Sequence, residues 1–219
     1  MAMNWLFPLL AAVVAMVFCG LVLRQYVTRR RQYQLAWAAG LVLFAIAAGA
    51  ECVSAASGWT STSYRVYYVA SATLVAYLAL GTVYLLIGRR LANVVAVILV
   101  LLTGAMLVVA FQSPVDQVVL GSVVGHAIGG QGWSSGSIVR LLSPLFTVPG
   151  SIVLIGGALY GGWQFWRKQV QANRLVGNVL IAAGALILAG AGGLARFGQP
   201  EFLYVGELLG IVVMFVGFL

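Results

Sequence analysis

The sequence predicts an all-α integral membrane protein, a bundle of seven transmembrane helices with its N-terminus outside and its C-terminus in the cytoplasm. Hydrophobic residues make up 63% of the 219 residues and charged residues only 7%, which leaves too little polar surface to cover a soluble domain of this length. Apolar runs long enough to cross a bilayer recur along the whole chain. Basic residues are concentrated in alternate connections between these runs.

A bilayer core of about 30 Å requires about 20 apolar residues per spanning helix, and the chain divides into segments of that length. We place the spans at 4–23, 33–53, 65–87, 91–111, 145–166, 174–194 and 202–219. The first residues contain no basic region and no cleavage site followed by a polar chain, so we expect the first span to be retained and not removed as a signal peptide. The chain is then a single transmembrane domain, 1–219.

The basic residues predict the orientation of the bundle. Adjacent spans alternate in direction, so the connections after the first, third and fifth spans share one side of the membrane. Those connections hold nine of the twelve Lys and Arg residues: Arg24, Arg29, Arg30, Arg31, Arg89, Arg90, Arg167, Lys168 and Arg174. The positive-inside rule makes that side cytoplasmic. Because the cations form short clusters between apolar runs, the net charge of +8 indicates topology and not a nucleic-acid partner.

The connection between the fourth and fifth spans, 112–144, is the only long one. Ser113, Pro114 and Asp116 form a helix start, and the valines that follow at helical spacing predict a short interfacial helix over 114–127. A stretch rich in Gly and Ser around Trp133 predicts a flexible segment before the fifth span. Two interpretations stay open for this outer loop: a lid or partner surface, and the favoured one, a loose connector with one interfacial helix.

The first three spans can be overlaid on the last three if one outer connection is shortened. The overlay aligns Leu6-Phe7 with Leu145-Phe146, Arg29 with the region of Lys168, Tyr68-Val69 with Tyr204-Val205, and Gly81 with Gly217. Either the chain contains a parallel three-plus-one-plus-three repeat, or apolar segments match by accident. A repeat would resemble sugar-transporter and PQ-loop proteins and, more distantly, opsins, in which a linker helix joins two triplets. That resemblance concerns architecture and does not fix function.

Three stretches carry a closer resemblance. They are Trp59–Leu86 with its Tyr64-Arg65-Val66-Tyr67-Tyr68 motif, Ser143–Gly150, and the run from Gly177 through Arg196-Phe197-Gly198. In these stretches the chain resembles a family of uncharacterised bacterial multi-pass membrane proteins. The resemblance implies seven helices in the bacterial cytoplasmic membrane and brings no activity with it.

Missing residues exclude several kinds of protein. Lys168 is the only lysine and lies in a connection, so no retinal Schiff base can form in the last helix. His126 is the only histidine, which excludes bis-histidine haem ligation. Cys19 is expected near the cytoplasmic side of the membrane and Cys52 near the outer side, so they form neither a disulfide nor a metal motif. Known enzyme signatures are absent, and we expect no enzymatic activity, no cofactor and no metal site.

The remaining polar residues gather near the predicted outer face. All four acids, Glu51, Asp116, Glu201 and Glu207, map to this side. Glu207 is about 9 Å along the last helix from Glu201 at a rise of 1.5 Å per residue, which puts it inside the outer leaflet, where an acid needs a partner.

We therefore expect an outward-facing pocket for a small polar solute or a cation. Its predicted residues are Glu51, Arg65, Tyr68, Tyr204 and Glu207, with Arg140 and Arg196 as pairing residues. The alternative, which is favoured, is purely structural: Arg65 or Arg196 neutralises Glu207, and the tyrosines form an interfacial belt.

Two functions follow from this interpretation. The leading hypothesis is a carrier or channel-like protein for a small solute or ion. The second is a non-transporting accessory or sensory subunit that binds a partner or lipid through the outer loop and the bundle face. Gly157 and Gly161, with the small residues of the sixth span, suit close helix packing within the bundle or in a homo-oligomer. Membrane lipids are the remaining expected partners.

Overall fold

The computed structural model describes residues 5–123, 128–134, 136–168, 172–196 and 201–219. These residues form an all-α protein without β-strands. The elements are α1 (Leu6–Arg29), α2 (Gln32–Ser57), α3 (Ser61–Leu86), α4 (Arg89–Gln112), α5 (Gln117–Ser122), the 3-10 helix η1 (Gly130–Gly132), α6 (Ile138–Lys168), α7 (Ala172–Arg196) and α8 (Glu201–Phe218). The predicted all-α class is confirmed.

Five helices, α1, α2, α3, α4 and α6, are long and apolar enough to cross a membrane. The last two helices contain shorter apolar stretches, Val179–Gly192 in α7 and Phe202–Phe218 in α8. Length and apolar composition therefore fit a membrane protein, whereas the number of seven spans and their orientation stay predictions.

α6 differs most from its predicted span. It begins at Ile138, well before the expected start at 145, and contains both Pro144 and Pro149. A proline removes one backbone donor and suits a first helical turn, whereas the expected start came from the length of the apolar segment alone. Only the carbonyl four residues before each proline loses its helical partner, and the helix continues through both positions.

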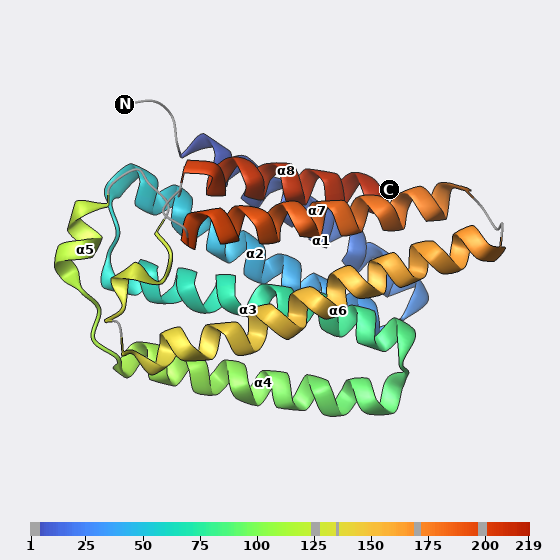
Figure 1. Cartoon of the computed structure of the whole chain (residues 1–219), viewed down its shortest axis with the longest axis horizontal. Helices are drawn as coiled ribbons and strands as arrows, with labels where there is room; N and C mark the ends of the chain where they lie inside the picture. Colours follow the sequence, from blue (N-terminus) through green and yellow to red (C-terminus); the bar gives the residue numbers. More distant parts are fainter. Residues whose placement is uncertain (1–4, 124–127, 135, 169–171, 197–200) are drawn as a thin grey trace.

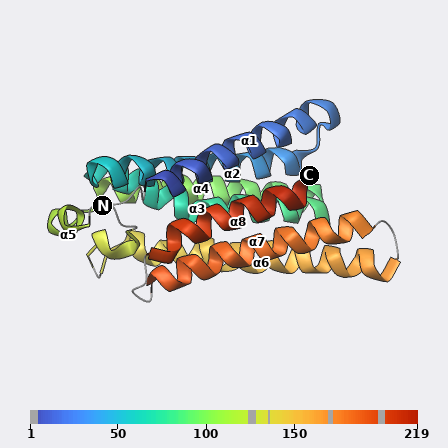
Figure 2. The same ribbon diagram turned by 90° about the horizontal axis from the view of Figure 1, so that it is seen from above.

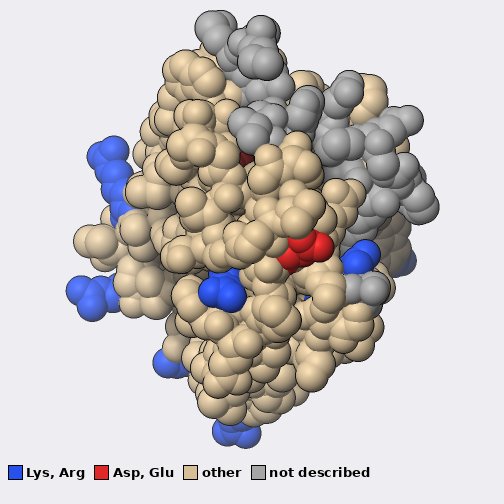
Figure 3. Space-filling view, turned by 90° about the vertical axis from the view of Figure 1, so that its left-hand side faces the viewer, with Lys and Arg blue, Asp and Glu red and all other residues tan. Residues whose placement is uncertain are grey.

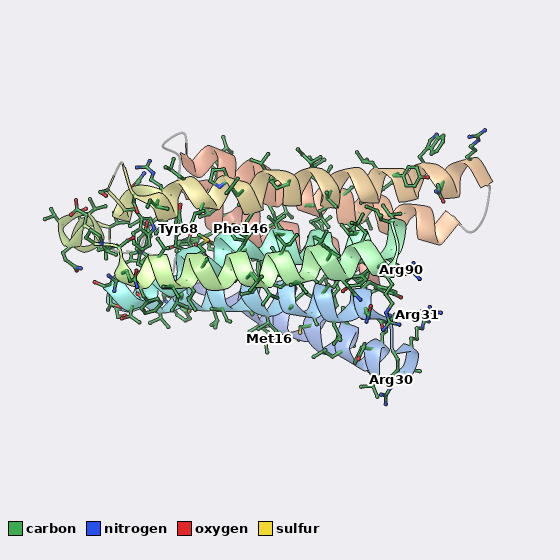
Figure 4. The ribbon with its side chains drawn as sticks, turned by 90° about the horizontal axis from the view of Figure 1, so that it is seen from below. Met16, Arg30, Arg31, Tyr68, Arg90 and Phe146 are labelled. Atoms are coloured by element: carbon green, nitrogen blue, oxygen red, sulfur yellow. The ribbon has the colours of Figure 1, made fainter. Side chains whose placement is uncertain are left out.

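The long helices run alternately in opposite directions along the bundle (Figure 1). We call the end that carries α5 the α5 end, and the end where α1 meets α2 and α3 meets α4 the basic end. Arg30, Arg31 and Arg90 lie together at the basic end, whereas Tyr68 lies toward the α5 end (Figure 4). The basic clusters that are separated in the sequence therefore share one end of the molecule.

The main helix pairs follow a symmetric scheme. α2 packs against α1 and α3, α7 packs against α6 and α8, and the two triplets meet through α3 with α6 and α1 with α8. If α1 is exchanged with α6, α2 with α7 and α3 with α8, the same set of helix pairs results. α4 packs mainly on α3 and lies outside the scheme (Figures 1 and 2).

Glycines allow close approach of α2 to α3 and of α7 to α8. Gly40 of α2 lies against Leu78 of α3, and Gly184 of α7 lies against Met214 of α8. Three residues after Leu78 in α3, Gly81 lies against Trp37 of α2. Three residues after Met214 in α8, Gly217 lies against the backbone of Ile181 of α7. A Cβ atom at Gly40, Gly81, Gly184 or Gly217 would overlap a neighbouring atom, so these contacts require glycine.

Candidate functional site

Glu51 lies near the C-terminal end of α2 on its most tightly packed face. That face is recognised by buried residues at helical spacing, Ala47, Ala48, Glu51 and Ser54. The Glu51 side chain is completely buried, with 0% of its surface exposed. The sequence places an acid where the helix packs against its neighbours.

Glu207 reaches the same place from α8. Its carboxyl group lies close enough to the Glu51 carboxyl for the two acids to interact directly. Two tyrosine hydroxyls interact with both acids, that of Tyr67 from α3 and that of Tyr204 from α8. We call Glu51, Tyr67, Tyr204 and Glu207 the acid-pair site.

Close packing between α7 and α8 holds this face of α8 toward α2. Gly206 lies against Ala191, and Gly210 lies against Leu188, so that the backbones of the two helices approach closely. Glu207 follows Gly206 directly and Tyr204 is three residues earlier, on the same helical face. The small residues Gly206 and Gly210, on the side of α8 that packs against α7, thus position Tyr204 and Glu207 on the side that faces α2.

Most polar atoms of the acid-pair site have no partner. Both carboxyl oxygens of Glu51, Oε2 of Glu207 and the hydroxyl of Tyr204 are buried and accept or donate no well-formed hydrogen bond. Neither acid forms an ion pair with any Lys or Arg whose side chain the structure describes. An ionised carboxylate buried without a partner destabilises a protein by about 3–5 kcal/mol, so this site favours a proton or a ligand that supplies positive charge.

Arg65 does not supply that charge. Its Nη2 donates a hydrogen bond to the Ser113 carbonyl at 3.0 Å, and its guanidinium carbon lies 5.7 Å from the ring centroid of Phe111. Both partners belong to the end of α4. The predicted position of Arg65 beside the acids is therefore corrected, and so is the alternative in which Arg65 neutralises Glu207. The long Arg65 side chain reaches the neighbouring end of α4 and does not enter the interior of the bundle.

Tyr68 also lies outside the acid-pair site, in an aromatic layer toward the α5 end. The layer consists of Trp59, Tyr64, Tyr67, Tyr68 and Trp133. Ring centroids are 5.6 Å apart between Tyr68 and Trp133, 5.3 Å between Tyr64 and Trp133, and 5.0 Å between Trp59 and Tyr67. Because Tyr67 belongs to both groups, the layer connects the acid-pair site with the α4–α6 connection.

We call the described residues of that connection, 113–123, 128–134, 136 and 137, the cap. Its two strands of chain are joined by an antiparallel bridge between Val115 and Trp133 and by a hydrogen bond from Asp116 N to the Gly132 carbonyl at 2.9 Å. Asp116 also caps α5, because its side chain accepts from the amides of Val118 and Val119. α5 is shorter than the predicted helix over 114–127, of which 124–127, with His126, lie outside the described residues.

The cap is fixed to the beginning of α3. The Tyr64 hydroxyl donates to the Gly129 carbonyl at 2.9 Å, and Gln117 Nε2 donates to Ser61 Oγ at 2.6 Å. Trp133 is 1% exposed. The expectation of a loose connector is therefore wrong for these residues, because one large buried ring outweighs the flexibility of the glycines around it.

The other predicted residues take different places. The exposed Arg140 of α6 has its side chain near Gly130 and Tyr64 and makes no contact with the acids. The side chain of Arg196 lies outside the described part of the chain. Thus Glu51, Tyr204 and Glu207 come together as predicted residues of one site, while Tyr67 was missed. Seen from the α5 end, Lys and Arg atoms show at several places on the described surface, and acidic atoms show only in small areas (Figure 3).

Comparison of the chain with protein-family models, curated proteins and solved structures found no match. The resemblance to bacterial multi-pass membrane proteins stays a prediction. The geometry of the acid-pair site is the basis on which a function can be argued.

Proposed function

We propose that this protein is a seven-span carrier of the bacterial cytoplasmic membrane that binds a small solute or ion at the acid-pair site. One observation carries the proposal: the site is divided between two helix triplets. Glu51 and Tyr67 come from α1–α3, and Tyr204 and Glu207 come from α6–α8. In carriers built from repeats, the binding site lies at the interface between the repeats.

Matching contacts support a parallel three-plus-one-plus-three repeat with α4 as its linker. In the overlay of Leu6 on Leu145 and Gly81 on Gly217, Phe18 aligns with Gly157 and Phe218 with Thr82. Phe18 stacks on Phe218 between α1 and α8, and Gly157 lies against Thr82 between α6 and α3. The same aligned positions therefore meet in both seams between the triplets. This agreement supports the repeat over an accidental similarity of apolar segments.

The orientation follows from the basic end. If the connections with Arg30, Arg31 and Arg90 face the cytoplasm, the acid-pair site lies in the outer half of the membrane, below the cap. Its two acids belong to different triplets, so a relative movement of the triplets changes the distance between the carboxyl groups. Such a change would couple binding at the site to access from one side.

The test is flux in vesicles that contain only this protein. Purified protein is reconstituted, and proton movement is followed with an entrapped pH-sensitive dye and sodium movement with a tracer. Glu51→Gln and Glu207→Gln are each expected to reduce flux at least tenfold while the protein stays folded. Asp116→Asn is the matched control, because Asn still caps α5 and one acid at the same end is lost. Unchanged flux in both Gln variants would overturn the assigned site.

An accessory or sensory role is the second proposal, and the surface of α5 favours it. Val118 is 81% exposed on this helix, which leaves an apolar side chain available to a partner or to lipid at the cap. Absence of flux for every tested ion, together with loss of a stoichiometric partner in Val118→Asp, would favour this role over the carrier.

A further inference from the structure

We propose that Glu51 and Glu207 share one proton, which makes the ligand of the acid-pair site a proton and neither a metal ion nor a polar solute. The inference rests on the site assigned above and names what that site binds. It assigns no role to Arg65, Arg140 or Tyr68, which lie elsewhere.

No cation among the described side chains compensates the charge of the pair. Glu51 is 0% exposed, and its carboxyl faces that of Glu207. Two ionised carboxylates in contact repel each other, and burial strengthens the repulsion. One proton removes half of the charge and converts the repulsion into an O–H···O⁻ hydrogen bond, which is among the strongest that side chains form.

Among the side chains that the structure describes, the groups that face the pair offer no other compensation. Tyr67 approaches from α3, Tyr204 from α8, and Cys52 from α2 next to Tyr204. None of these carries positive charge. α1, which packs on both α2 and α8, buries only Pro8, Ala11, Ala15, Phe18, Cys19 and Val22. The α7 residues in contact with α8 that the structure describes are small or apolar, such as Ala191 and Leu188.

The acid-pair site also offers few oxygen ligands to a metal ion. Calcium takes six to eight oxygens and magnesium an octahedral shell. The unpartnered oxygens here belong to two carboxyl groups and one hydroxyl, and the described residues contain no group of three or more His, Cys, Asp or Glu that could hold a metal. A proton needs no coordination shell, since it completes a bond between oxygens already in place.

Water accepts the proton that leaves the carboxyl pair. In the paired state the proton is bonded to one carboxyl oxygen and accepted by the other, and the site carries one negative charge. When the triplets move apart, the O–H bond breaks and water takes the proton as hydronium. Two carboxylates remain, and their repulsion holds the site open until a proton returns. The Tyr204 hydroxyl can rotate to donate to an oxygen that the proton leaves.

Infrared difference spectroscopy of the full-length protein in lipid nanodiscs tests the inference without any transport. At neutral pH the wild-type protein should show the C=O stretch of one protonated carboxyl per chain. That band should disappear in alkaline buffer and shift in D2O. It should be absent from Glu51→Gln and Glu207→Gln and present in Asp116→Asn.

A wild-type protein without the band at neutral pH would overturn the shared proton, and this result does not depend on whether a variant folds. Loss of the band on addition of sodium or calcium ions at neutral pH would overturn it as well, in favour of a metal site. A band that behaves as expected in a protein without flux would overturn the carrier and leave the shared proton standing. The two proposals therefore fail separately.

Discussion

The carboxyl groups of Glu51 and Glu207 face each other between α2 and α8, although the two residues are far apart in the sequence. Their contact joins the two helix triplets, and no Lys or Arg whose side chain the structure describes pairs with either acid. A carboxyl pair without a cation is sensitive to the number of protons it holds. The relationship therefore has consequences for stability as well as for function.

The first prediction concerns stability as a function of pH. Above the pH range in which glutamate ordinarily titrates, both acids are ionised in the unfolded chain. The folded pair still holds one proton in that range. Stability rises with pH only where the unfolded state binds more protons, so here it falls as pH rises, by about 1.4 kcal/mol per pH unit for one proton. Thermal unfolding of the purified protein across neutral and alkaline pH measures the slope.

Glu51→Gln is expected to flatten this slope, because Gln is neutral at every pH and can hydrogen-bond to the remaining carboxyl. Asp116→Asn should leave it unchanged. A wild-type slope that the Gln variant reproduces in full would show that other groups are responsible.

The sequence predicted the helices better than the site, and the reason is physical. Apolar runs of fixed length predict where a helix lies in the chain, whereas side-chain partners depend on the rotation of each helix. Tyr67 and Tyr68 are neighbours, so they point about 100° apart on a helix with 3.6 residues per turn. Only the packing of α3 determines that Tyr67 faces the acids while Tyr68 faces Trp133.

The convergence of Glu51, Tyr204 and Glu207 could be anticipated, because depth in the membrane is proportional to position along a helix. The partner of Arg65 could not, because a long side chain can reach several neighbours at a similar energy. The cap was interpreted from its glycines as flexible, and no sequence signal indicates that Trp133 is buried against α3.

The second prediction compares two adjacent glycines of α6. A Cβ atom at Gly157 would overlap Thr82 of α3, whereas one at Gly156 would meet no atom within 4 Å. Gly157→Ala should therefore destabilise the protein by about 1–3 kcal/mol through overpacking. Gly156→Ala should be neutral or stabilising by up to about 1 kcal/mol, because Ala favours the helix over Gly.

Thermal unfolding in detergent compares the two variants directly. Equal melting temperatures would show that α3 and α6 are not closely packed along this seam. If the triplets move against each other, Gly157→Ala should also slow flux in vesicles more than Gly156→Ala does.

The third prediction concerns the attachment of the cap. Trp133 is 1% exposed and stacks on Tyr64 and Tyr68. Trp133→Ala removes most of this contact and should destabilise the cap by about 3–5 kcal/mol, which exceeds what a local segment usually retains. Limited proteolysis should then cleave the α4–α6 connection at least tenfold faster than in the wild type.

Trp163→Ala is the control, because the Trp163 side chain is 48% exposed and lies in the half of α6 that is remote from the cap. Its proteolysis should match the wild type. Equal cleavage of the connection in both variants would mean that Trp133 does not hold the cap on α3.

The last prediction sets two buried tyrosine hydroxyls against each other. The Tyr64 hydroxyl donates to the Gly129 carbonyl at 2.9 Å, whereas the Tyr204 hydroxyl is buried without a hydrogen bond. Tyr64→Phe should destabilise the protein by about 0.5–1.5 kcal/mol, since it removes one bond and leaves a carbonyl unpaired. Tyr204→Phe should be neutral or stabilising at neutral pH, because it removes a polar atom that has no partner.

The same pair distinguishes structure from function. Tyr204→Phe should reduce proton flux in vesicles while its melting temperature is maintained, because the hydroxyl acts only when the shared proton leaves. Tyr64→Phe should lower the melting temperature and leave the carboxyl band intact. If Tyr204→Phe were destabilising by as much as Tyr64→Phe, its hydroxyl would have a structural partner and the acid-pair site would be more completely hydrogen-bonded than its geometry indicates.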